Sequence, residues 1–85
     1  MKLRIKKKFT MKTIQIYSKF IKLDQLLKFA GVAESGSVAK AMILDEMVTV
    51  NGEVVTARGK KIYPGDRIEV EGLGEALEVT AEDTP

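Results

Sequence analysis

The sequence contains no cysteine and no histidine. Without these residues the chain has no disulfide framework, no thiol chemistry and none of the usual Cys/His zinc sites. The same absence removes Ser-His and Cys-His nucleophile pairs and the side chain that most often acts as a base near neutral pH. We therefore expect a protein that is not an enzyme, with no metal, no cofactor and no small-molecule substrate.

Long apolar runs are also missing. No stretch approaches the ~20 apolar residues that a membrane-spanning helix needs. The basic N-terminus is not followed by the uninterrupted apolar region of a secretory signal. The 85 residues are 45% hydrophobic and 31% charged, which is the composition of one small globular domain. We expect a cytoplasmic protein that does not act at a membrane.

Charge is distributed unevenly along the chain. Residues 1–40 carry ten Lys or Arg and two Asp or Glu, which gives a net charge of +8. Residues 41–85 carry four Lys or Arg and ten Asp or Glu, which gives a net charge of −6. Such a split suggests a basic face for a polyanion and an acidic face that discourages indiscriminate binding. The first ten residues supply five of the cations, and Met11 opens a stretch that reads like a natural start. We expect residues 1–12 to be a basic arm or leader, 13–80 to be the domain and 81–85 to be a frayed tail.

Two segments have the apolar spacing of helices. In the first, residues 22–31, the apolar side chains recur at i, i+3, i+4 and i+7, and Gly31 is suited to end the helix. The second, residues 34–46, has Ser35 or Ser37 as a possible N-cap.

Strands are predicted before and after the helices. Alternating apolar residues indicate strands at 13–18 and 76–80, and "VTVNGEVV" at 48–55 predicts a hairpin around Asn51-Gly52. "KIYPGDRIEV" predicts a second hairpin of this kind, with Pro64-Gly65 at its turn and Asp66 accepting backbone N–H bonds. The order β-α-α-β-β-β-β predicts an α+β domain in which two helices pack on one face of a small, mostly antiparallel sheet.

Four stretches, "KLDQLL", "ESGSVAKAMI", "VTVNGEVV" and "YPGDRIEV", follow one another in an order and spacing that resemble the S4-like RNA-binding domain. The resemblance covers residues 22–70. "RGKK" before "YPGD", and "SG" where many members have Ser-Arg, are most similar to the small stand-alone bacterial members. Gly36 stands where many members have arginine, so one side-chain contact is absent. Glu46 stands where glycine is usual, which leaves the geometry of that turn open.

The resemblance implies an S4-like fold that grips structured RNA, often ribosomal, through the starts of both helices and the basic loop that follows. Carried over by position, the RNA-binding residues are Lys22, Ser35, Gly36, Lys40, Arg58, Lys60 and Lys61.

Without the family resemblance, the sequence supports an RNA-binding role more strongly at some of these positions than at others. The cations of residues 58–61 are dense enough to favour phosphate binding over a merely solvated loop. On spacing alone, Ser35 and Gly36 favour an ordinary N-cap over a phosphate site at a helix N-terminus, and only with the family resemblance do the two roles become about equal. Lys22 and Lys40 alone are typical of solvated helix faces. Tyr63 is a candidate for stacking on a base, whereas Tyr17 and Phe29 are expected to pack in the core or on the sheet.

We therefore expect a monomer that binds structured RNA, with ribosomal RNA first, in ribosome assembly or translation. The alternative is a protein-interaction module on the same fold. RNA binding requires that Lys22, Lys40, Arg58, Lys60 and Lys61 converge on one face.

Overall fold

A computed structural model describes residues 10–72 and 74–81 of the chain. It contains strands β1 (Thr10–Ile16) and β2 (Ile21–Lys22), helices α1 (Leu23–Phe29) and α2 (Gly36–Leu44), and strands β3 (Val48–Val50), β4 (Glu53–Val54), β5 (Lys61–Ile62), β6 (Arg67–Val70) and β7 (Glu75–Ala81). The predicted α+β class, with two helices against a mostly antiparallel sheet, is confirmed.

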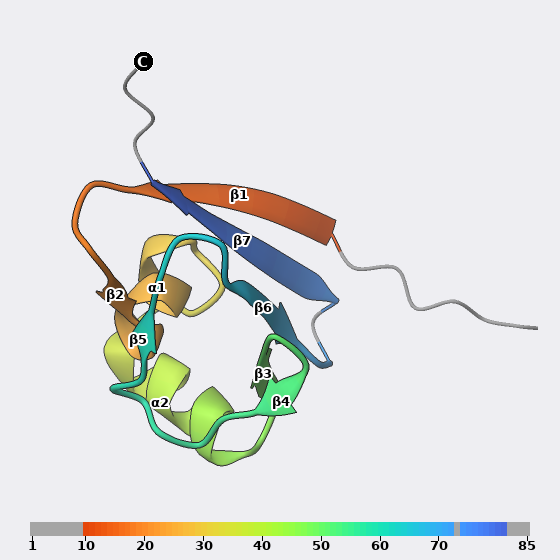
Figure 1. The fold of residues 1–85 in the computed structure, drawn as a ribbon. Helices are drawn as coiled ribbons and strands as arrows, with labels where there is room; N and C mark the ends of the chain where they lie inside the picture. Colours follow the sequence, from red (N-terminus) through yellow and green to blue (C-terminus); the bar gives the residue numbers. More distant parts are fainter. Residues whose placement is uncertain (1–9, 73, 82–85) are drawn as a thin grey trace, which may run out of the picture.

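The main sheet has five strands in the order β1-β7-β6-β3-β4. Its pairs are antiparallel except β1–β7, which is parallel and brings the first strand beside the last, with Ile14 opposite Val79. Figure 1 shows β1 and β7 running side by side, with both helices on one side of the sheet. Strands β2 and β5 form a separate antiparallel pair next to the helices.

The core lies between the helices and the main sheet. Leu23, Leu26 and Leu27 of α1 are fully buried, as the helical spacing predicts. They pack with Ile43 of α2 and with side chains from alternate positions of the strands, including Ile68. Each such side chain contributes about 1.5–3 kcal/mol through burial.

Both helices are shorter than predicted, because their first and last residues form caps. Ser35 is the N-cap of α2, and its Oγ accepts a hydrogen bond from the Val38 N–H, at 3.2 Å. Gly31 follows α1 with a φ of 79°, a conformation that glycine adopts without steric cost, so its role as the helix stop is confirmed.

The two turn predictions have different outcomes. Asn51 and Gly52 have φ values of 52° and 90°, which confirms a type I′ hairpin turn between β3 and β4. At Pro64-Gly65, the Asp66 N–H donates to the Tyr63 carbonyl at 3.0 Å, and Gly65 has a φ of 99°, as in a type II turn. The predicted second hairpin is nevertheless wrong, because β5 pairs with β2 and β6 pairs with β3 and β7.

Three further predictions need correction. Strand β1 begins at Thr10, so its first three residues lie in the segment expected to be a basic arm; residues 1–9 lie outside the described part. The predicted element order omitted β2 and counted four strands after the helices, whereas the described residues contain five there. Tyr17 and Phe29 are 75% and 67% exposed rather than buried in the core or against the sheet.

Candidate nucleic-acid interface

The pairing of β2 with β5 brings two separate basic segments together. Lys22 and Lys61 are directly opposite in this antiparallel pair. The backbone N–H of Leu23 donates to the Lys60 carbonyl at 2.9 Å, and that of Asp24 donates to the Arg58 carbonyl at 3.1 Å. The first N–H groups of α1, which have no partner within the helix, are thus satisfied by the loop.

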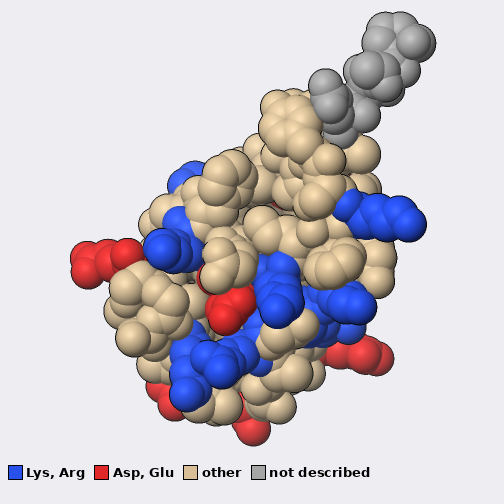
Figure 2. Space-filling view, turned by 90° about the vertical axis from the view of Figure 1, so that its left-hand side faces the viewer, with Lys and Arg blue, Asp and Glu red and all other residues tan. Residues whose placement is uncertain are grey.

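These contacts fix the basic loop beside the start of α1. We call Lys22, Arg58, Lys60 and Lys61 the basic cluster; all four are exposed. Figure 2 shows the corresponding side of the molecule, where Lys and Arg side chains gather and most acidic side chains lie toward the rim. Like charges directly opposite on paired strands are destabilising, so the Lys22–Lys61 pair costs stability in the free protein.

Two aromatic rings adjoin the basic cluster. The Lys61 ammonium lies over the Phe20 ring, 4.9 Å from its centroid, and the rings of Phe20 and Tyr63 are 5.9 Å apart at a tilt of 52°. The cation–π contact holds Lys61 in place beside Lys22. Sequence reasoning missed Phe20 because it precedes a two-residue strand and belongs to no apolar pattern.

An acidic side chain also belongs to this region. Asp24 is half-buried in the first turn of α1, and its backbone is bonded to that of Arg58. Its Oδ1 is buried and has no hydrogen-bond partner among the described residues. A carboxylate here offsets part of the repulsion among the neighbouring cations.

The remaining predicted positions lie on α2. The Ser35 hydroxyl caps the helix, which is the ordinary structural role considered for it. Gly36 and Lys40 are both exposed and, being four residues apart, lie on the same face of the helix. Within the described residues, no hydrogen bond or ion pair joins them to the basic cluster. Lys40 therefore lies on α2, outside the basic cluster.

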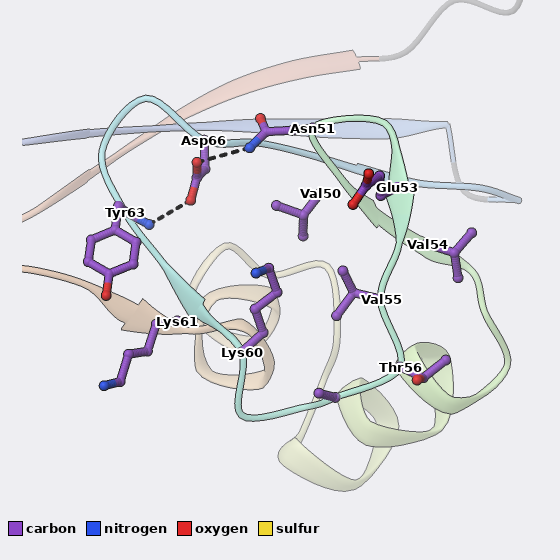
Figure 3. A pocket seen from close by; sticks show the side chains of 11 residues that line it. Val50, Asn51, Glu53, Val54, Val55, Thr56, Lys60, Lys61, Tyr63 and Asp66 are labelled. Atoms are coloured by element: carbon purple, nitrogen blue, oxygen red, sulfur yellow. Dashed lines mark hydrogen bonds between the residues drawn. The ribbon is translucent and has the colours of Figure 1, made fainter.

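A hollow of about 630 Å³ opens next to the basic cluster. Its walls come from the β3–β4 hairpin, the β4–β5 connection and the turn after β5, through Val50, Asn51, Glu53, Val54, Val55, Thr56, Ala57, Lys60, Lys61, Tyr63 and Asp66. Figure 3 shows that the Lys60 side chain runs into this hollow, whereas Lys61 turns away from it toward the side of Tyr63. The two lysines of the loop therefore lie on two adjoining surfaces: Lys60 in the hollow and Lys61 on the side of Tyr63.

Hydrogen bonds between two turns hold one wall of the hollow. Asp66 accepts from the Tyr63 N–H at 2.8 Å, as predicted, and also from the side-chain amide of Asn51 at 3.0 Å. The Asn51 Oδ1 accepts from the Arg67 N–H at 3.0 Å, which fixes the orientation of its amide. The bond between Asn51 and Asp66 joins residues 15 positions apart, so local sequence patterns could not reveal it.

In the part of the chain that the structure describes, no helix has the length and apolar character required to cross a membrane.

Comparisons with known proteins agree with this architecture. The family model of the S4 domain matches residues 14–80. Over 61 residues the chain is 44% identical to a protein of Bacillus subtilis (strain 168) named "Probable ribosome maturation protein RlbA", an alignment that covers 72% of this chain and 86% of the relative. The family match includes both helices and strands β2 to β6 in full, the last three residues of β1 and all of β7 except Ala81. This chain therefore belongs to the S4 domain family.

Proposed function

We propose that this protein is a non-catalytic, monomeric, cytoplasmic protein that binds structured RNA, with ribosomal RNA as the first candidate, during ribosome maturation. The observation that carries the proposal is the Lys22–Lys61 pair, in which two cations are held directly opposite each other. A phosphate group placed between them would replace their repulsion with two attractive contacts.

The rest of the basic cluster extends this arrangement. Arg58 offers a guanidinium that can hold a phosphate with two hydrogen bonds, whereas the lysines act as point charges. Contacts of this kind recognise the shape and backbone of a folded RNA rather than its base sequence. Membership of the S4 domain family, and a relative named for ribosome maturation, support a role in RNA binding or at the ribosome.

The test is a pair of salt titrations on one structured ribosomal RNA fragment. We expect affinity to fall with salt, with a log–log slope of roughly −3 to −4 for about 3–5 phosphate contacts. The double variant Lys22→Gln/Lys61→Gln should bind more weakly and flatten the slope by about two units, one for each lost contact. Its free energy of unfolding should change by no more than about 1 kcal/mol, because the loss of the cross-strand repulsion offsets the loss of the Lys61–Phe20 cation–π contact.

A matched control removes the same charge elsewhere. Lys12 bonds to the Ala30 carbonyl and lies 4.0 Å from Glu75, and Arg67 pairs with Glu69 at 3.0 Å. The variant Lys12→Gln/Arg67→Gln should keep the parent slope. Equal losses in the two double variants would show that net charge alone matters, and binding that ignores salt would overturn the electrostatic account.

An exposed aromatic pair favours the alternative function, protein binding. Tyr17 and Phe29 border a separate hollow of about 230 Å³, between the end of β1, β2 and α1. Large exposed aromatic side chains beside a hollow are typical of protein interfaces. If Tyr17→Ser/Phe29→Ser loses association with ribosomal particles while Lys22→Gln/Lys61→Gln keeps it, the protein-interaction function is the correct one.

A further inference from the structure

Among the residues that the structure describes, two charged side chains that line the hollow beside the basic cluster have no partner. Glu53, from the β3–β4 hairpin, and Lys60, from the opposite wall, both line it. Figure 3 shows the Glu53 carboxylate and the Lys60 side chain directed into the space between the hairpin and the loop. Among the described residues, neither side chain has a hydrogen bond or an ion pair.

The remaining walls suit a flat ring. Val55, which is half-buried, supplies apolar surface between the two charged groups, whereas Val50 is only 5% exposed. The Asn51–Asp66 bond fixes the hairpin turn against the neighbouring turn, so this wall is set before a ligand arrives. The volume, about 630 Å³, lies within the range of about 300–1,000 Å³ that is usual for small-ligand sites.

We propose that this hollow receives an unpaired guanine of the bound RNA, an inference that rests on the proposed RNA-binding function. The guanine ring packs mainly against Val55. Its N1–H and N2–H groups donate to the two oxygens of the Glu53 carboxylate, and the Lys60 ammonium binds the guanine O6 or an adjoining phosphate.

Guanine fits this pair of charges better than the other bases do. A carboxylate is an acceptor with two oxygens, and guanine has two adjacent N–H donors on its Watson–Crick edge. Uracil has a single N–H donor on that edge, flanked by carbonyl oxygens that a carboxylate repels. Adenine and cytosine place a ring-nitrogen acceptor next to their amino group. The carboxylate therefore selects for guanine, while the lysine provides charge attraction to any nucleotide.

The test follows backbone amide signals of the ¹⁵N-labelled full chain by NMR during titration with UUGUU, UUAUU, UUCUU and UUUUU. We expect UUGUU to shift the amides of Asn51, Glu53, Val55 and Lys60, and to bind roughly five-fold or more tightly than the others. UUIUU, in which inosine replaces guanosine and lacks the N2–H groups, should lose most of that advantage. Guanosine monophosphate should bind more weakly than UUGUU, because it lacks the flanking phosphates.

Two variants separate the roles of the charged groups. Glu53→Gln replaces one carboxylate oxygen with a donor and should abolish the preference for UUGUU over UUAUU. Lys60→Gln should weaken binding of all the oligonucleotides while keeping their order. The control Glu78→Gln removes an exposed carboxylate on β7, outside the hollow, and should change neither affinity nor order.

The outcomes distinguish this inference from the proposed function. If the parent binds structured RNA with the expected salt slope but shows no guanine preference, or shifts amides elsewhere, the guanine site is wrong and RNA binding stands. Equal binding of guanosine monophosphate and UUGUU would assign the hollow to a free nucleotide instead and overturn the inference. Failure of structured RNA to bind at all would reject both.

Discussion

Glu46 shows how a single residue can depart from its family without changing the fold. After α1, the N–H groups of Gly31 and Val32 donate to the carbonyls of Lys28 and Leu27. After α2, the N–H groups of Glu46 and Met47 donate to the carbonyls of Ile43 and Met42 in the same pattern, which is the Schellman motif. Glu46 has a φ of 61°, so it adopts the conformation that favours glycine, at a steric cost of about 1–2 kcal/mol.

The variant Glu46→Gly should therefore be more stable than the parent. Relief of the left-handed strain outweighs the added entropy of the unfolded chain, and we expect a net gain of about 0.5–1 kcal/mol. In a domain of this size, that corresponds to a rise in Tm of about 2–8 °C. Thermal and urea unfolding measure it. The control Asp45→Gly, at a position with a φ of −83°, offers no such relief and should be neutral or destabilising. If the Glu46→Gly variant is less stable than the parent, the inference that Glu46 is sterically strained is wrong.

Among helices and strands, those with a repeating apolar pattern were predictable. The spacing of Leu23, Leu26 and Leu27 indicated α1, and Asn51-Gly52 indicated the hairpin, since both signals are local. Strands β2 and β5 contain two residues each, which is too short for any period to appear. Their pairing depends on segments about forty positions apart, so the Lys22–Lys61 pair could not be derived from spacing. The family resemblance named these positions without revealing their contact.

Helix α2 offers a test of the site by gain of function. A Cβ at Gly36 would meet nothing within 4 Å, so the fold does not require glycine there. The variant Gly36→Arg adds a cation on the helix face that carries Lys40, at a position where many members of the family have arginine. We expect tighter binding of structured RNA and a salt slope steeper by about one unit. Stability should hold or rise slightly, because arginine favours helices more than glycine does.

The matched control for this variant is Val38→Arg. Val38 is 40% exposed and lies two positions after Gly36, so it faces nearly the opposite side of α2. The same charge on the same helix should leave the salt slope closer to that of the parent. If both arginines steepen the slope equally, the face of α2 that carries Gly36 and Lys40 does not contact RNA in particular.

In the folded molecule, the charged side chains are not separated into a basic half and an acidic half as they are along the sequence. The basic cluster takes Lys22 from the basic first part and Arg58, Lys60 and Lys61 from the acidic second part. Strand β1, from the basic part, lies beside β7, where Lys12 is 4.0 Å from Glu75. The fold thus concentrates cations at β2–β5 and brings opposite charges together at β1–β7. The net charge of each sequence segment predicted a basic face but not its location.

The boundary of the domain gives the last prediction. Residues 1–9 lie outside the described part. Deletion of residues 1–10 removes only one described residue of β1, Thr10, which pairs with Glu75 at the start of β7. The buried Ile16 and the pairing of Ile14 with Val79 remain. We therefore expect Tm to change by no more than a few degrees, roughly the effect of a surface change. Affinity for structured RNA should fall most at low salt, because five cations are lost.

A longer deletion provides the contrast. Removal of residues 1–16 takes away all of β1, leaves the edge of β7 unpaired and uncovers core side chains that Ile16 contacts. This variant should unfold or aggregate, because an apolar strand edge becomes open to other chains. Circular dichroism and size-exclusion chromatography distinguish the two deletions. A large loss of Tm in the shorter one would place the start of the domain before Met11, whereas a folded, monomeric longer one would show that β1 is dispensable.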